Sequence, residues 1–309
     1  MDQFTKITKS PKNPGIHNIY YRNILGLSFL YIFRYYKIMK SSKEHSLDKK
    51  IIGTLKALEL SGKAVEVVSM VLEDDEIQAI QEYANNVSII RLGFNDHGPV
   101  HMRCVMLNAI IMLDFLKQAG IKTSLQSENV GDFEDSLIAV CLAGMLHDLG
   151  MSVGRTDHEL HSTYLAYPIL DRLLQKTMPG KIGKRITIRS LALEAISGHM
   201  GNRSVNSLEA GVVQVADGCE MTKGRARIPI ALTQTPKAGN IHQTSANSIE
   251  EVKLSRGEEK PIRIDIHMSS EVGLFQVEEV LLAKIKGSTA KPHIELYAQV
   301  AEGNPRQYL

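Results

Sequence analysis

Between residues 47 and 92, apolar side chains recur every three or four positions, which is the spacing of one face of a helix. The pairs Ser61-Gly62 and Asp74-Asp75 interrupt this pattern. Short polar or glycine-containing breaks of this kind separate helices. We therefore expect three short helices in this part of the chain.

A long apolar helix is expected at residues 99–119, because Pro99 suits a first helical turn and Gly120 suits a helix end. The next apolar run leads from Asp132, a residue type that caps helix N-termini, to Gly150. Helical spacing then recurs at residues 158–174, 188–197 and 208–221. The middle of the chain is therefore expected to be helical throughout.

The pattern changes after about Gly257. Residues 262–266 and 293–300 alternate with a period of two, as strands do, and residues 277–285 between them have helical spacing. The predicted fold class is mostly α, with a small C-terminal α+β unit. The expected divisions are a poorly ordered N-terminal extension at residues 1–45, a helical domain at 46–240 and a small α+β domain at 241–309.

Composition narrows the functional classes. The net charge of the 309 residues is only +2, so the chain as a whole does not resemble a nucleic-acid-binding protein. An apolar stretch at residues 24–33 is about half as long as a membrane-spanning helix. The chain has three cysteines, and this odd number argues against a disulfide framework. We expect a cytoplasmic protein that is not integral to a membrane.

Histidines and aspartates at the expected helix ends suggest a metal site. Six of the eleven histidines lie between residues 97 and 199. His147 and Asp148 are adjacent, and adjacent helical residues point about 100° apart, so both can bind one cation only where the helix ends, at Gly150. Asp217 interrupts an apolar helical run, where an unpaired carboxylate is costly and a cation would relieve that cost.

The order of these residues resembles that of the HD superfamily of metal-dependent phosphohydrolases, and of its archaeal members most closely. The similar motifs are His101-Met-Arg-Cys-Val, Ala143-Gly-Met-Leu-His-Asp-Leu-Gly150, His161, Ile196-Ser-Gly-His and Val215-Ala-Asp217. The resemblance implies an HD-type helical bundle that binds one or two divalent transition metal ions. Manganese, iron, cobalt or nickel suit such ligands, and magnesium is an alternative.

The resemblance also implies roles for individual residues. His147 and Asp148 would form the catalytic centre, and Asp148 would bridge two metals. The implied metal ligands are His101, His147, Asp148, His161, His199 and Asp217. His97 competes with His101 for its place, and His158 competes with His161. The implied reaction is attack of a metal-activated water on a phosphomonoester or phosphodiester, in a nucleotide or oligonucleotide.

A basic segment after Asp217 provides candidates for binding the substrate phosphate. Lys223, Arg225 and Arg227 lie in a glycine-containing stretch, where guanidinium groups suit phosphate oxygens. The segment also resembles the HD module of ribonuclease Y. Arg155 and His158 are weaker candidates, and a solvated loop is the alternative interpretation of the basic segment.

Two departures from the family pattern exclude one substrate and leave others open. Met151-Ser152 stand where a lysine often follows the His-Asp motif, so a phosphate contact of the family is expected to be missing. No Gly-Tyr-Pro follows His199, as it does in the cyclic-dinucleotide branch of the family, so hydrolysis of cyclic di-GMP is not expected. The alternatives are a non-catalytic regulatory module that binds metal and nucleotide, and a ribonuclease. The expected partners are a phosphorylated small molecule or oligonucleotide and a second copy of the chain, bound through strand edges of the C-terminal unit.

Overall fold

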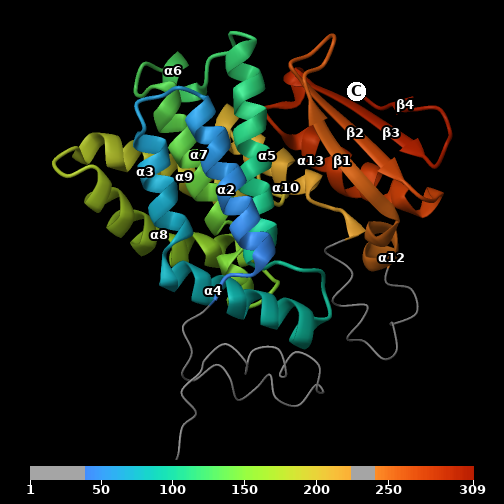
Figure 1. Ribbon diagram of the computed structural model, residues 1–309, viewed down its shortest axis with the longest axis horizontal. Helices are drawn as coiled ribbons and strands as arrows, with labels where there is room; N and C mark the ends of the chain where they lie inside the picture. Colours follow the sequence, from blue (N-terminus) through green and yellow to red (C-terminus); the bar gives the residue numbers. More distant parts are fainter. Residues whose placement is uncertain (1–38, 224–240) are drawn as a thin grey trace, which may run out of the picture. The chain divides into compact units, whose positions relative to one another are not determined.

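The computed structural model describes residues 39–223 and 241–309, apart from the side chain of Gln243, and Figure 1 shows its elements. Lys40–Leu309 form one compact unit. Most of the expected N-terminal extension lies outside the described residues, as do Arg225 and Arg227. The first described helix, α2, begins at Ser42 behind the N-cap Ser41.

The first part of this unit is helical, as predicted. The main helices are α2 (Ser42–Ala57), α3 (Lys63–Leu72), α4 (Asp75–Asn86), α5 (Pro99–Gln118), α7 (Phe133–Leu146), α8 (His158–Thr177), α9 (Ile182–Gly198) and α10 (Leu208–Cys219). A π-helical turn, η2 (Val87–Leu92), extends α4, and the short elements α6 (Ser124–Ser127) and η3 (Leu149–Ser152) flank α7. Helix α9 begins six residues before its predicted start, because its first turns are largely exposed and so lack the apolar period.

Helices α5 and α7 pack together at a close approach that glycine permits. A Cβ atom on Gly144 would lie 2.9 Å from the Cα atom of Met106, so any larger residue would push the two backbones apart. Asp132 caps α7 by accepting a hydrogen bond from the backbone N–H of Asp135. The close contact between Gly144 and Met106 brings the start of α5 beside the end of α7.

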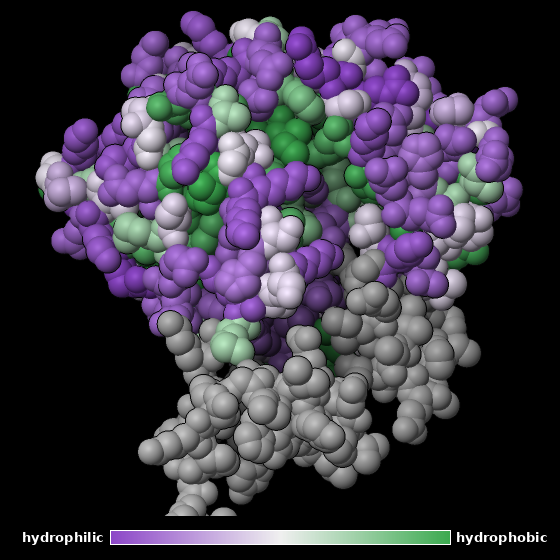
Figure 2. Space-filling view, in the orientation of Figure 1, coloured by the Kyte–Doolittle hydropathy of each residue, from purple (hydrophilic) through white to green (hydrophobic). Residues whose placement is uncertain are grey.

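Helix α5 is the one described helix that is long and apolar enough to cross a membrane. Its most apolar window is 67% buried inside the protein, as in the core helices of globular domains. On the face shown in Figure 2, hydrophilic residues predominate, and hydrophobic residues show mainly between neighbouring elements.

The remaining elements form the C-terminal unit, which follows the helices as predicted. They are α12 (Ile241–Ser248), β1 (Ile249–Ser255), β2 (Ile262–Met268), η4 (Glu271–Gly273), η5 (Gln276–Leu281), α13 (Leu282–Gly287), η6 (Lys291–His293), β3 (Ile294–Val300) and β4 (Arg306–Gln307). The sheet order is β1-β2-β3-β4. Strand β2 pairs in parallel with β3, and the other pairings are antiparallel.

The parallel pairing of β2 and β3 requires a crossover, which η5 and α13 provide. Alternate residues of β2, from Ile262 to Met268, are buried, as the period of two predicts. The pattern analysis missed β1, because three of its seven residues are charged and the strand is only partly buried. Helix α13 also packs against α10, so the C-terminal unit contacts the end of the helical part that carries Asp217.

Candidate metal centre

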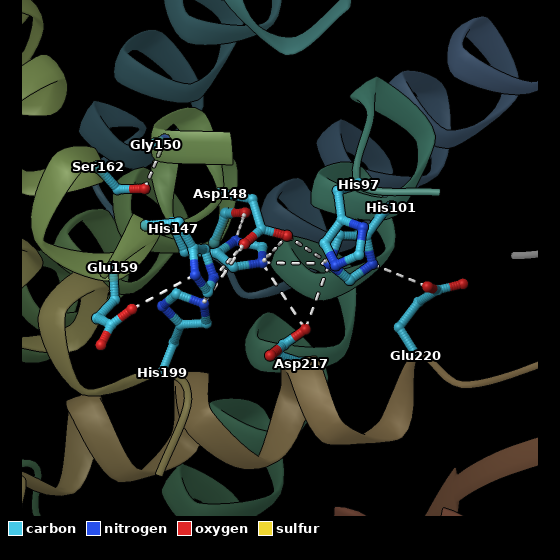
Figure 3. Close-up of polar contacts among 12 residues, drawn as sticks. His97, His101, His147, Asp148, Gly150, Glu159, Ser162, His199, Asp217 and Glu220 are labelled. Atoms are coloured by element: carbon cyan, nitrogen blue, oxygen red, sulfur yellow. Dashed lines mark hydrogen bonds and ion pairs between the residues drawn. The ribbon is translucent and has the colours of Figure 1, made fainter. Parts of the chain in front are cut away.

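Six side chains on or just after the helices α5, α7, α8, α9 and α10 converge where these helices meet, and Figure 3 labels all of them except His158. They are His101, His147, Asp148, His158, His199 and Asp217. His101 lies in the first turn of α5, and its Nε2 atom is 3.2 Å from Nε2 of His147 and 3.2 Å from Oδ2 of Asp148. The same Nε2 atom is 3.3 Å from Oδ1 of Asp217. These four residues make up one group of potential ligands.

A second group forms around the other carboxylate oxygen of Asp148. Oδ1 of Asp148 is 3.3 Å from Nε2 of His158 and 3.4 Å from Nε2 of His199. The two Nε2 atoms are 3.2 Å apart. Asp148 therefore lies between two sets of histidines and offers one oxygen to each (Figure 3).

The outer nitrogens of the four rings all contact oxygen acceptors. Nδ1 of His101 lies 2.8 Å from Oε2 of Glu220. Nδ1 of His147, His158 and His199 lies 2.7–3.0 Å from the backbone carbonyls of Gly144, Arg155 and Ile196, respectively. Because these oxygens only accept hydrogen bonds, each Nδ1 carries the proton and each Nε2 can present its lone pair to the centre. This arrangement is typical of metal-binding histidines.

Burial and neighbouring charges shift the pKa values of two side chains in the centre. Asp148 is 2% exposed, and burial alone would raise its pKa. The positive charge that His147 and His97 carry when protonated, with the hydrogen bonds that protonated His101 and His147 donate, outweighs burial and holds the pKa of Asp148 well below its usual value. Burial lowers the pKa of His199 to about 4. Asp148 is thus ionised and His199 neutral near pH 7, which are the forms that bind a cation.

The spacing of the converging atoms fits metal ions. Bonds of about 2.0–2.2 Å place neighbouring ligand atoms roughly 3–3.5 Å apart, and the closest atoms of both groups are 3.2–3.4 Å apart. His101, His147 and Asp217 form one possible metal-holding set, and His147, Asp148 and His199 form another. Mixed imidazole and carboxylate ligands suit divalent metal ions.

The model of the HD domain family matches residues 101–222, from the first histidine of the centre to just beyond Asp217. "Uncharacterized protein MJ1020" of Methanocaldococcus jannaschii is 41% identical over 246 residues, which are 80% of this chain and 93% of that protein. The chain belongs to the HD domain family. No solved structure matches it. The six converging side chains are called the HD centre below, and the family places the chain among the metal-dependent phosphohydrolases.

The structure places a different histidine of α8 at the HD centre from the one that was expected. His158, the first residue of α8, lies against Oδ1 of Asp148, in the place that the family resemblance assigns to His161. Gly150 explains why His158 lies there. A Cβ atom at this position would lie 2.0 Å from the carbonyl oxygen of His158, so only glycine allows the backbone of α8 to come this close. The start of α8 is pressed against the turn after Asp148, whereas His161 lies one turn further along α8 and is partly exposed.

The structure brings the other five predicted ligands together, and it assigns His97 a different place. Nδ1 of His97 contacts the carbonyl of Asn95 at 2.7 Å and the hydroxyl of Ser88 at 2.9 Å. Its ring packs edge-on against that of His101 at 5.8 Å. His97 thus borders the centre beside His101, whose Nε2 atom lies against His147 and Asp148.

Of the candidates for phosphate binding that the structure describes, one lines the cavity and another does not. Lys223 is exposed, with its Nζ 3.9 Å from Oε1 of Glu250, and it does not line the cavity at the HD centre. Arg225 and Arg227 lie outside the described residues. Arg155 does line the cavity, with its guanidinium 5.8 Å from the centroid of the Phe94 ring.

The sequence analysis did not identify two residues that contact the HD centre. Glu220 contacts Nδ1 of His101, and its position three residues after Asp217 was a usable signal. Lys284 of α13 forms an ion pair with Oδ2 of Asp217. Nothing in the sequence pattern links Lys284 to the HD motifs, because it lies in the C-terminal unit.

A cavity of about 540 Å³ opens onto the HD centre. The helical part contributes Asp148, His199 and Asp217 to its wall, and the C-terminal unit contributes other residues. Those from the C-terminal unit are His242, Ala246, Gln276, Glu279, Val280, Ala283 and Lys284. The cavity is large enough for a small-molecule ligand, and both parts of the chain shape it.

Proposed function

We propose that this protein hydrolyses a phosphoester bond of a nucleotide or oligonucleotide with one or two divalent metal ions bound at its HD centre. One observation carries the proposal. Each of the four imidazoles has its Nδ1 against an oxygen acceptor and its Nε2 directed at Asp148 or Asp217. Side chains held in this way have a fixed tautomer and are ready to bind a cation.

The ligands divide into two sites. His101, His147 and Asp217 would hold one cation with Oδ2 of Asp148, and His158 and His199 would hold a second with Oδ1 of Asp148. Divalent cations bound there would supply Lewis acidity, which lowers the pKa of water and neutralises charge on a phosphoester. The chain's own contribution is to fix six ligands in a buried setting that opens to a substrate cavity.

The wall of the cavity supports the assignment to a nucleotide. The exposed ring of Phe94, with the Arg155 guanidinium beside it, offers a flat surface on which a base can stack. Asn95 and Gln276 also line the cavity and can hydrogen-bond to base edges. A ligand with a phosphate at the HD centre and a flat polar-edged group against Phe94 matches this wall.

The test combines metal analysis with a substrate screen. Wild-type protein is purified gently and its metal content is measured, alongside His147→Ala, Asp148→Ala and the matched control His161→Ala. We expect near-stoichiometric transition metal in the wild type and the control, and loss of metal in the other two. Loaded protein is then given nucleoside monophosphates, cyclic nucleotides, dinucleotides and short oligonucleotides.

The screen also separates this proposal from its alternatives. Metal-dependent release of phosphate or of a nucleotide that disappears in Asp148→Ala supports the proposal. Faster cleavage of oligonucleotides than of free nucleotides would identify a ribonuclease. Tight binding of metal and nucleotide without turnover across the whole panel would identify a regulatory module, and a folded wild-type protein that takes up no metal would overturn the proposal.

A further inference from the structure

Lys284 is a buried cation in a part of the chain with no HD motif. It lies on α13 of the C-terminal unit and is only 7% exposed. Lysine is among the residues that are rarely buried, because its ammonium group loses hydration there. Its Nζ atom contacts Oδ2 of Asp217, a member of the HD centre, so an opposite charge offsets the cost.

The two carboxylate oxygens of Asp217 face different partners. Oδ1 lies 3.3 Å from Nε2 of His101 and 3.7 Å from Nε2 of His147, whereas Oδ2 contacts Lys284. A cation bound among the histidines would use Oδ1 and leave the contact of Oδ2 with Lys284 intact. Lys284 can therefore stay in place when the HD centre is loaded.

The stem of Lys284 runs along a slot lined by two glycines of the helical part. A Cβ atom on Gly218 would lie 3.3 Å from Cδ of Lys284, and one on Gly201 would lie 3.5 Å from its Cγ. Gly218 belongs to α10, and Gly201 follows α9 with a φ of 81°. A side chain at Gly218 would thus crowd Lys284, whereas one at Gly201 would make an ordinary contact with it.

A lysine that only tethered the C-terminal unit to α10 could make its contact away from any ligand site. Lys284 instead lines the cavity together with Asp148, His199 and Asp217. Its ammonium group has three N–H donors, of which Asp217 accepts one. The ammonium group therefore keeps two donors that a ligand in this cavity could use.

We propose that Lys284 binds a non-bridging phosphate oxygen of the substrate while it remains paired with Asp217, so that the C-terminal unit completes the catalytic site. The proposal rests on the phosphohydrolase function proposed above. It gives the C-terminal unit a defined role, because this unit carries the positive charge that meets the phosphate on the side opposite the histidines.

The test measures phosphate binding separately from metal binding. Manganese-loaded wild-type protein, Lys284→Met, Lys284→Arg and Lys286→Met are titrated with inorganic phosphate by calorimetry, and manganese content and melting temperature are measured on the same samples. Lys286 is the matched control, because it is an exposed lysine on the same short helix.

We expect Lys284→Met to keep its manganese and to bind phosphate at least about tenfold more weakly, as the loss of one charge-assisted hydrogen bond implies. Lys284→Arg should recover part of the affinity, and Lys286→Met should match the wild type. If Lys284→Met does not fold, Lys284→Gln, whose amide can still donate to Asp217, is measured in its place.

The outcomes distinguish this inference from the function on which it rests. Unchanged phosphate affinity in a manganese-loaded Lys284→Met or Lys284→Gln protein would overturn the role of Lys284 alone. A wild-type protein that takes up neither manganese nor any other divalent transition metal would overturn the phosphohydrolase assignment itself. Equal weakening in Lys286→Met would show a general effect of net charge and would also count against the proposal.

Discussion

The Nε2 atoms of His158 and His199 lie 3.2 Å apart, although 41 positions of sequence separate the two residues. Both atoms also lie within 3.4 Å of Oδ1 of Asp148. Two bare imidazole nitrogens at this distance repel each other unless something positive lies between them. The start of α8 and the end of α9 are therefore held together in a geometry that a cation would stabilise.

When the wild type has a metal ion in both sites, His158→Ala should lower the metal content of the purified protein to about half, because His158 belongs to only one of the two ligand groups. His161→Ala is the matched control, since it removes the same side chain from the next turn of α8. Elemental analysis of both variants shows which of the two histidines is needed for metal binding. A loss of metal in His161→Ala with none in His158→Ala would contradict the structural assignment.

Glu220→Gln should weaken metal binding about 10–100-fold without unfolding the protein, because Glu220 orients His101 through its Nδ1 and increases the basicity of the ring. A chelator competition assay gives the affinity. Glu279→Gln removes the same charge from another part of the cavity wall. Equal affinities for the two variants would mean that only the overall charge matters.

Gly150→Ala should destabilise the protein by about 3 kcal/mol, because the new methyl group overlaps the backbone of α8. Its Cβ would lie 2.0 Å from the carbonyl oxygen of His158 and 2.6 Å from the backbone nitrogen of Ser162. Gly154→Ala is the control, since no atom lies within 4 Å of a Cβ placed there. Denaturant unfolding of both variants measures the difference, and similar stabilities would refute this explanation of Gly150.

The metal-free protein should lose stability as the pH falls from about 6.5 to about 4. Burial lowers the pKa of His199 from 6.5 to about 4, so in this window the unfolded chain binds a proton that the folded chain does not. The stabilisation is complete above pH 6.5 and decreases as the solution is acidified. Asp148 and Asp217, whose pKa values are also lowered, add a loss of the same sign below about pH 4.

Urea unfolding in the presence of a chelator, repeated across this pH range, measures the effect. His199→Gln should flatten the dependence, while His161→Gln should leave it unchanged. A slope that survives in His199→Gln would assign the effect to other groups.

The helices and the order of the ligands could be predicted because both follow from local patterns. Apolar spacing located α5 and α7, and the aspartate within the apolar run of α10 marked a buried charge that needs a partner. The choice between His158 and His161 could not be made in this way, since residues three apart on a helix share a face. It depends on where α8 meets the turn at Gly150, which is a tertiary contact.

The contact of the C-terminal unit with the HD centre could not be predicted from the sequence for a related reason. Periodicity identified β2 and β3, but it carries no information on which residue of α13 meets α10. The charges of β1 concealed that strand, and the ion pair of Lys284 with Asp217 joins segments 67 positions apart. Contacts of this range become apparent only when the two parts are assembled.

The position of Lys284 in the sequence also has a consequence for synthesis, because its partner Asp217 precedes it by 67 residues. All six ligands of the HD centre are translated before Lys284, and at about 5–20 residues per second the ribosome needs several more seconds to reach it. A nascent chain can thus assemble its metal ligands before it possesses the lysine that we assign to the phosphate. The chain would then bind its metal ion first, and it would bind the substrate phosphate only when α13 and the strands after it have been made. An incomplete chain would therefore hydrolyse its substrate poorly even with the metal bound.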